Sequence, residues 1–268
     1  QIGSYDTASL HTEGFIHCSR PHQVLEVANI FFKDSFSDLI LLHINEELVT
    51  APVKYEGDAD DKFPHIYGAL NLNSVIGTYE FPQDKKGFSL PRDFELVGDT
   101  LVRLGRPGDE AEITSTHTHA WQQSYQGIVP DNFLTARPLS FRSRLLWLKS
   151  GVEGKPPATF FVAESARHGI IGFCAAEPAR DEEFKGFGEI SAIYCLNEYK
   201  GKGIGAALFR MGQQQLTKMG FQSSYLWVLR DNPTILFYKK MGGVRIDKEK
   251  AIDLGKPLIE VVYEWRNS

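Results

Sequence analysis

The sequence predicts an α/β (α+β) fold, in which a mixed sheet flanked by helices follows a smaller mixed α+β domain. Residues 189–196 alternate as a strand does, pass through three glycines spaced by single residues, and continue from Ile204 at helical spacing. Two short apolar runs, 159–163 and 169–175, are typical of a β-hairpin. Residues 81–92 contain prolines, a glycine and charges, which is the composition of a linker between two domains.

Length and composition describe an ordinary globular chain. Its 268 residues suffice for two domains, and 42% apolar with 24% charged residues is not typical of a disordered protein. The net charge of -5 argues against a general nucleic-acid binder, and no apolar run is long enough to span a bilayer. The three cysteines match no zinc-ligand spacing, so we predict no metal site and a reduced, cytoplasmic protein. The two domains are predicted at 1–92 and 93–268.

The segment before the linker is predicted to form short strands around one helix. The helix is expected at 21–32, and the strongly apolar run 38–44 is typical of a buried strand. Two other extended runs each carry two polar side chains at alternating positions, which puts each pair on one face. The pairs are His17 with Ser19 and His65 with Tyr67. They line a polar pocket in one interpretation and are structural residues in the other, which spacing alone favours.

The same residues resemble a known family. The segments 13–19 and 63–68, with Gln23, are similar to the bacterial domain-of-unknown-function family 952, and the resemblance extends over most of 1–82. That family is similar in fold to ADP-ribosyltransferases, so the resemblance implies a compact mixed sheet and a nucleotide pocket. We therefore expect an accessory or ligand-binding module, with an NAD-using transferase activity as a further alternative.

The C-terminal segment is predicted to contain both strands and helices. Strand patterns at 94–97 and 100–104 come first, and Pro107 with the acidic residues after it predicts a helix that extends towards Gln126. The remaining elements are expected at 141–149 (helix), 224–229 (strand), 232–241 (helix), 244–246 and 259–265 (strands).

The strand, the glycines and the helix start together predict a phosphate site. The unpaired N–H groups of the first helical turn point outward, and glycines let an anion approach them closely. Gly201, Gly203 and Ala206 satisfy the dinucleotide fingerprint G-x-G-x-x-G/A. A doubly wound fold would need more strand–helix units than the fewer than forty residues after Asp231 can provide. The triphosphate loop G-x-x-x-x-G-K-[ST] is absent from this stretch.

A different loop family fits the stretch 200–205. Its sequence Lys-Gly-Lys-Gly-Ile-Gly resembles the (Gln/Arg)-x-x-Gly-x-(Gly/Ala) loop of the GNAT superfamily of N-acetyltransferases, and 232–242 resembles that family's second motif. The departures are Lys200 at the Gln/Arg position and Gly243 where an aromatic residue is usual. The resemblance covers about 99–268 and implies acetyl-CoA as cofactor. The residues implied to bind it are Ile193, Cys195, Lys200, Gly201, Lys202, Gly203, Ile204, Gly205, Ala206 and Asn232.

Acetyl transfer from a thioester to an amine needs a neutral amine and a proton for the leaving thiolate. The resemblance implies Glu189 as the general base and Tyr238 as the general acid. Glu189 is six residues before Cys195 and is expected on the same strand face. The alternatives are a solvated carboxylate at a strand start and a half-buried aromatic that anchors the last helix. Since no histidine is positioned by sequence to activate Cys195, we favour direct transfer over a covalent thiol intermediate.

The acceptor site is less well defined by the sequence. Trp121 and Tyr125 lie where GNAT proteins often build the acceptor wall, although aromatic residues at helical spacing are also typical of a core. The acidic run 181–183 either attracts a cationic amine or is a solvated charge run. We therefore predict an acetyl-CoA-dependent N-acetyltransferase that acts on a small-molecule or peptide amine. A non-catalytic sensor of coenzyme A or a nucleotide is the alternative. We expect no membrane or nucleic-acid partner, and a homodimer is compatible with the sequence.

Overall fold

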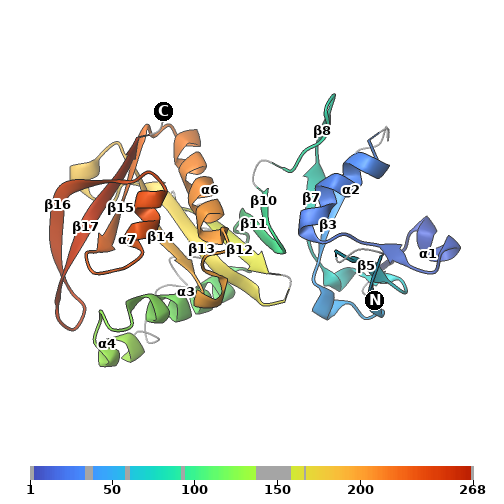
Figure 1. Ribbon diagram of the computed structural model, residues 1–268, viewed down its shortest axis with the longest axis horizontal. Coiled ribbons are helices and arrows are strands. Elements are labelled where there is room, and N and C mark those ends of the chain that lie inside the picture. The colour runs from blue at the N-terminus through green and yellow to red at the C-terminus, as the bar shows by residue number, and fades with distance from the viewer. Residues whose placement is uncertain are drawn as a thin grey trace. The chain divides into compact units, whose positions relative to one another are not determined.

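The computed structural model describes residues 3–33, 39–57, 61–91, 94–136, 158–165 and 167–266. The chain divides into two compact units, which are described separately (Figure 1). The first comprises Gln1–Leu101 with Ser165–Gly169, and the second comprises Val102–Glu164 with Ile170–Ser268. The helix predicted at 141–149 lies outside the described residues. The domain boundary expected near residue 92 stays a prediction.

The first unit is built from short strands and two helices. Its strands are β1 (Ser4–Tyr5), β2 (Ile16–His17), β3 (Leu39–Ile44), β4 (Val53–Glu56), β5 (Phe63–Ile66), β6 (Leu70–Asn71), β7 (Val75–Phe81), β8 (Gln83–Asp84) and β9 (Gly87–Phe88). Its helices are α1 (Ala8–Thr12) and α2 (Val24–Phe31), the latter preceded by the 3-10 turn Pro21–Gln23. The 3-10 turn and α2 together form the helix predicted at 21–32. The unit as a whole is the predicted small mixed α+β domain. Among the described residues the strand pairs β1–β6, β2–β5, β4–β5, β3–β7 and β8–β9 are antiparallel, whereas the resemblance implied a compact mixed sheet.

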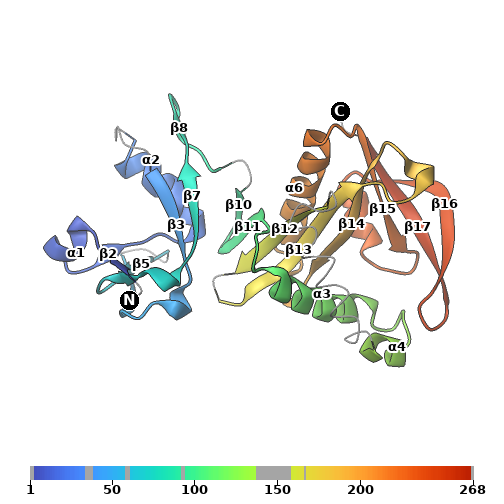
Figure 2. The same cartoon turned by 180° about the vertical axis from the view of Figure 1, so that it is seen from behind.

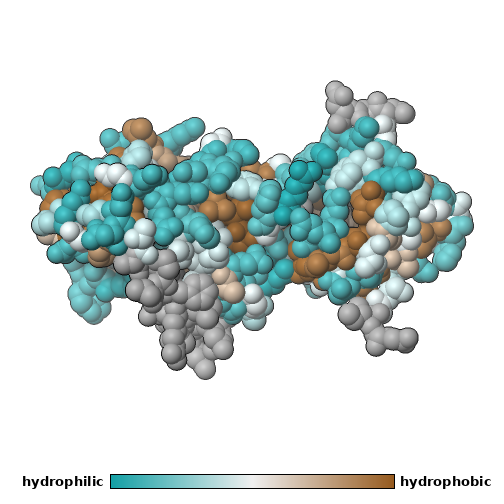
Figure 3. All heavy atoms as spheres, turned by 90° about the horizontal axis from the view of Figure 1, so that it is seen from below, coloured by the Kyte–Doolittle hydropathy of each residue, from teal (hydrophilic) through white to brown (hydrophobic). Residues whose placement is uncertain are grey.

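The strand β3 is buried on one face only. Leu39 and Leu41 pack with α2, whereas Ile40 is 64% exposed and Leu42 is 38% exposed. The prediction of a buried strand at 38–44 is therefore right for the face that packs with α2 and wrong for the opposite face, which is exposed. Apolar patches interrupt the hydrophilic surface in the space-filling view (Figure 3).

The second unit is organised around a mixed sheet. The described strands of this unit form one sheet in the order β11-β12-β13-β14-β15-β17-β16, whereas β10 belongs to the residues of the first unit. Their bounds are β10 (Phe94–Val97), β11 (Thr100–Leu104), β12 (Thr159–Ser165), β13 (Gly169–Pro178), β14 (Gly188–Cys195), β15 (Ser223–Leu229), β16 (Val244–Asp253) and β17 (Pro257–Arg266). Since β14 and β15 are parallel while their other neighbours are antiparallel, the prediction of a mixed sheet is confirmed.

Helices cover both faces of this sheet. Helices α6 (Ile204–Lys218) and α7 (Ile235–Lys240) lie on one face (Figure 1), and α3 (Glu110–Tyr125) and α4 (Asp131–Ala136) lie on the other (Figure 2). The core beneath α3 is made of Ile113, Ala158, Phe160, Val162, Ile170, Phe173, Ala175 and Ala192. No helix in the described ranges has the length and hydropathy of a membrane span.

A bulge in β14 changes which side chains share a face. Ala192 is paired with Ala175 and Ile190 with Ala176, so Ser191 is an extra residue in the strand. Ile190 consequently faces Gly212 of α6, whereas Ala192 packs in the core beneath α3. The regular alternation predicted for 189–196 is therefore wrong, and Glu189 and Cys195 lie on opposite faces of the sheet.

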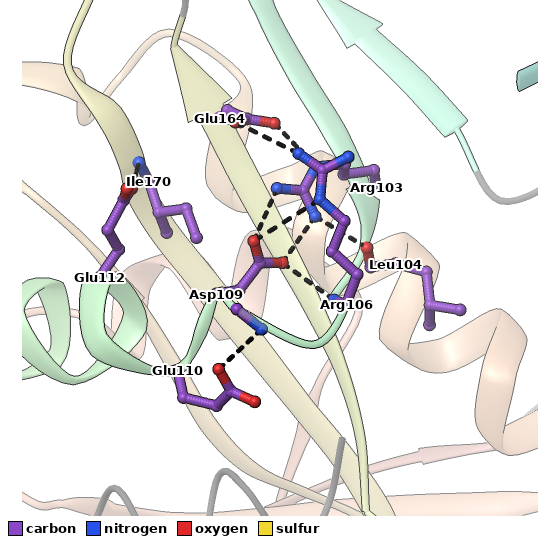
Figure 4. Close-up of polar contacts among 9 residues, drawn as sticks. Arg103, Leu104, Arg106, Asp109, Glu110, Glu112, Glu164 and Ile170 are labelled. Carbon is purple, nitrogen blue, oxygen red and sulfur yellow. Dashed lines mark hydrogen bonds and ion pairs between the residues drawn. The ribbon is translucent and has the colours of Figure 1, made fainter. Parts of the chain in front are cut away.

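A buried ion-pair network fixes the start of α3 (Figure 4). The guanidinium of Arg103, which is 1% exposed, donates to both carboxylate oxygens of Asp109 at 2.6 and 3.0 Å and to Glu164 at 2.7 Å. Burial acts to lower the pKa of Arg103, but these hydrogen bonds outweigh it and raise the pKa above its ordinary value. The network ties β11 and β12 to the residue that precedes α3, and so it fixes the helix that carries Trp121 and Tyr125.

Candidate active site

The parallel strands β14 and β15 separate soon after they begin. They are paired only at Gly188 with Ser224 and at Glu189 with Tyr225, while β13 stays paired with β14 as far as Cys195. The amide of Leu196 donates to β13 at 3.0 Å. Because amides alternate in direction along an antiparallel ladder, those of Ile193 and Cys195 point to the opposite edge, where β15 has moved away. The split therefore presents backbone donors that no neighbouring strand uses.

The glycine loop after β14 leads into the start of α6. Gly201 and Gly203 have φ values of 78° and 88°, a conformation that favours glycine. Gly203 is the N-cap residue, and no side chain caps the first turn of the helix. The N–H groups at 204–206 precede the first intrahelical bond, which Ala207 donates to Gly203 at 3.0 Å. This end of α6 therefore has the outward N–H groups that an anion site requires.

Two lysines add positive charge beside this helix start. The ammonium of Lys200 lies 3.4 Å from the Ser124 hydroxyl of α3, and burial lowers its pKa. The ammonium of Lys202 lies over the ring of Tyr199. The N–H groups and lysines at the loop can bind phosphate groups, and the free backbone N–H groups along the split can bind amide carbonyls. Acetyl-CoA, the cofactor that the loop sequence implies, carries both kinds of group.

Glu189 is buried at the point where the two strands begin to separate. It is 2% exposed, so the alternative of a solvated carboxylate is wrong. Its Oε2 accepts hydrogen bonds from the Arg180 amide (3.1 Å), the Arg180 Nε (3.0 Å) and the Tyr225 hydroxyl (3.0 Å). Its Oε1 accepts from Arg180 Nη2 at 2.6 Å. This carboxylate is held in one position by charge-assisted bonds.

Glu177 is a second buried carboxylate, which the sequence analysis missed. It lies directly opposite Glu189 on β13 and is 6% exposed. Burial raises its pKa above the ordinary value, and the charge of Glu189 adds to this, while Ser191 and Arg180 act against it. The register of the β13–β14 hairpin was the signal that could have found it, because directly opposed residues share a face.

Tyr238 of α7 is buried among other aromatic side chains. It is 6% exposed, and burial raises its pKa, to which the neighbouring Tyr125 and Cys174 add. The phenol therefore keeps its proton at neutral pH. Asn232 accepts a hydrogen bond from the Thr234 amide at 2.9 Å, immediately before α7 begins.

The residues proposed for the acceptor wall separate into two groups. Trp121 is 3% exposed and packs in the core formed with Val129, Leu134, Leu229 and Leu258, so its side chain is core. Tyr125 is half-buried, and its hydroxyl lies 3.4 Å from that of Tyr194. Tyr125 thus remains a candidate for contact with an acceptor, and Tyr194 joins it.

Two side chains of the acidic run 181–183 make contacts with neighbouring strands. Asp181 accepts a hydrogen bond from the Trp227 indole at 2.7 Å, and Glu183 forms an ion pair with Lys248. The run is thereby attached to β15 and β16. It borders a hollow of about 260 Å³ lined by Pro178, Ala179, Asp181, Glu182, Lys185, Gly186, Phe187 and Phe221.

In the first unit, the structure brings three of the four predicted pocket residues together. His17 of β2 lies opposite His65 of β5, with ring centroids 5.1 Å apart. Glu56 accepts hydrogen bonds from the Tyr67 hydroxyl (2.7 Å) and pairs with His65 Nδ1 (2.9 Å). No hydrogen bond joins Ser19 to this cluster in the ranges that the structure describes. The nucleotide pocket and the ADP-ribosyltransferase-like fold stay predictions.

Comparison with known proteins assigns each segment to a family. Residues 1–78 match the family model of a protein of unknown function, DUF952, and residues 109–243 match that of the acetyltransferase (GNAT) family. An uncharacterized N-acetyltransferase of Bacillus subtilis (strain 168), YuaI, is 30% identical over 165 residues, which are 61% of this chain and 91% of that protein. A mycothiol acetyltransferase of Saccharomonospora viridis is 34% identical over 88 residues, 31% of this chain and 29% of that protein.

A solved structure shares the fold of the second unit. The PaiA N-acetyltransferase of Thermoplasma acidophilum, crystallised in complex with coenzyme A, has a TM-score of 0.50 and 21% sequence identity. The similarity covers 62% of this chain and 98% of that one. Both resemblances identified from the sequence, to family 952 and to the GNAT superfamily, are confirmed.

Proposed function

The chain belongs to the GNAT acetyltransferase family, and on that premise we propose that it transfers the acetyl group of acetyl-CoA directly to the primary amine of a small molecule or peptide. The observation that carries this proposal is the split between β14 and β15, which ends at the uncapped start of α6. Two sets of backbone donors, one along the split and one at the start of α6, suit the acyl arm and the phosphates of the cofactor respectively.

The proposed cofactor contacts are made by the backbone N–H groups at the start of α6 and along the split. The N–H groups of Ile204, Gly205 and Ala206, with Lys200 and Lys202, hold the pyrophosphate. The amides of Ile193 and Cys195 hold the acyl arm, and Asn232 contacts it from the segment between β15 and α7. Bound acetyl-CoA supplies an acetyl group activated as a thioester.

The general acid and the general base are assigned from the burial of their side chains. Tyr238 holds a proton at its hydroxyl oxygen and donates it to the departing thiolate, since its raised pKa keeps that proton in place. The two buried carboxylates that face each other across β13 and β14, Glu177 and Glu189, are the candidates to accept the proton that the acceptor ammonium must lose. Burial raises the pKa of the Cys195 thiol to about 11, so this thiol stays protonated at neutral pH. That supports direct transfer over a covalent thiol intermediate.

The cofactor assignment is tested by calorimetry on the full chain. We expect acetyl-CoA to bind to one site with a negative heat capacity change, since apolar parts of the cofactor would be buried. Folded protein that shows no binding heat and no shift in thermal unfolding with acetyl-CoA would overturn the proposal.

A pair of glycine substitutions tests the loop itself. Gly203 and Gly220 stand at the two ends of α6 with φ values of 88° and 93°, so alanine at either position meets the same backbone strain, about 1–2 kcal/mol. We expect Gly203→Ala and Gly220→Ala to lose similar stability in urea unfolding. Only Gly203→Ala should also weaken acetyl-CoA binding, by about tenfold or more, if about 1.4 kcal/mol of contact is lost. Equal affinities in the two variants would remove this loop from the cofactor site.

A further inference from the structure

Two buried carboxylates face one arginine at the start of the split, and the structure distinguishes between them. Resting on the proposed transfer to an amine, we propose that Glu177 accepts the proton of the acceptor ammonium, and that Glu189 is a positioning residue that holds Arg180 beside it. The roles are assigned from hydrogen bonds, burial and register.

The hydrogen bonds of Glu189 leave little capacity for a proton. Its carboxylate accepts four hydrogen bonds, three of them from Arg180 and one from the Tyr225 hydroxyl. A proton on either oxygen would weaken the bidentate pair with Arg180 in a site where Glu189 is 2% exposed. Breaking a buried pair leaves an uncompensated charge, which is strongly unfavourable. Glu189 is therefore suited to hold Arg180 in place.

Glu177 has the opposite character. Its Oε1 is buried and accepts no hydrogen bond from any described residue, and the nearest cationic atom is Arg180 Nε at 3.6 Å. Its pKa is raised by burial and by the charge of Glu189, although Ser191 and Arg180 oppose this. A buried carboxylate with a free oxygen gains a proton at lower cost than one held by four donors.

The bulge and the arginine complete the arrangement. Because β13 and β14 pair Glu177 directly with Glu189, both side chains lie on the α3 face of the sheet, beside the Ser191 bulge. The side chain of Arg180 is 57% exposed, so it connects this buried pair with solvent. In the proposed step one N–H bond of the ammonium breaks and one O–H bond forms on Glu177. The neutral amine then has its lone pair for attack, and the proton leaves to solvent afterwards.

The test compares Glu177→Gln and Glu189→Gln in the full chain. The measurements are thiol release from acetyl-CoA against pH and the titration of glutamate side-chain carbons by NMR without ligand. We expect Glu177→Gln to lower kcat/KM about 100-fold at neutral pH and to remove the acidic limb of the profile. Glu189→Gln should keep that limb while lowering the rate. Glu260→Gln, on β17 and paired with Lys250, is the control and should change kcat/KM little.

The ligand-free titration separates this inference from the proposed function. The carboxyl signal that Glu177→Gln removes should titrate above the ordinary glutamate value of 4.5. Glu177→Asp identifies the same signal if the glutamine variant does not fold. Titration of that signal at or below 4.5, or an acidic limb that survives in Glu177→Gln and is lost in Glu189→Gln, would overturn the assignment. Acetyl-CoA binding that persists in both variants leaves the proposed function intact in either case.

Discussion

Replacing Tyr238 with phenylalanine should lower kcat about 100-fold while leaving the affinity for acetyl-CoA nearly unchanged. The substitution removes the hydroxyl that would protonate the departing thiolate but keeps the ring, which packs near Phe237 and Trp265. Loss of a general acid lowers kcat and kcat/KM together, whereas loss of packing would first appear in stability. Thiol release and calorimetry on the same preparations separate these effects.

The matched control is Tyr263→Phe. Tyr263 is 1% exposed on β17, and its ring centroid is 6.3 Å from that of Tyr238, so the same hydroxyl is removed from the same core. An equal loss of rate in both variants would point to packing, and an unchanged rate in Tyr238→Phe would exclude the acid role. The pKa of Tyr238 is raised, so its proton is lost only above pH 10, the ordinary value of a tyrosine. No fall in rate up to that pH should come from this group.

Replacing Arg103 with methionine should destabilise the second unit by about 3–5 kcal/mol in urea unfolding. The change removes the buried guanidinium that donates to both Asp109 and Glu164, each 8% exposed, and leaves them the longer ion pairs with Arg106 at 3.8 and 3.9 Å. Because Asp109 stands immediately before α3, we expect the helix that carries Tyr125 to lose protection from hydrogen exchange.

An exposed ion pair provides the comparison for Arg103. The Arg266 side chain is 86% exposed and pairs with Glu264 at 3.2 Å. Arg266→Met removes the same charge from the same sheet and should cost less than about 1 kcal/mol. If the two arginine variants unfolded at the same urea concentration, the buried network would not be what fixes the start of α3.

Local pattern was sufficient to predict the cofactor loop. The glycines, the strand before them and the helix after them are contiguous in sequence, and the backbone conformation of Gly203 follows from its residue type. The start of α3 after Pro107 was likewise predictable from its capping signals. The order of helices and strands along the chain was predictable from periodicity.

The register of the strands was not predictable, and the arrangement of the two buried carboxylates depends on it. The bulge at Ser191 shifts the faces of β14 by one residue, and nothing in the alternation of 189–196 indicates it. Glu177 was missed because it becomes a neighbour of Glu189 only when the hairpin is paired. His17 and His65 meet in the same way, across two strands that are 48 residues apart in sequence.

Burial of single side chains was also decided by tertiary packing. His117 is a polar residue of α3, yet it is only 9% exposed because its ring packs against Phe173 and Tyr194. Trp121 belongs to the same helix and is buried against β15 and β17 by the same contact of α3 with the sheet. The mean apolar pattern of α3 is weak, so the sequence gives little indication of which face is covered.

Thiol release from acetyl-CoA with a panel of amines is the most direct test of the central claim. The panel comprises small primary amines, polyamines, aminoglycosides and peptide N-termini, and mass spectrometry identifies the product. The account predicts that at least one class gives thiol and N-acetylated amine in equal amounts, and that Tyr238→Phe slows both together. Acetyl-CoA that binds to the folded chain but yields neither product with any amine class would contradict it and would favour a non-catalytic sensor.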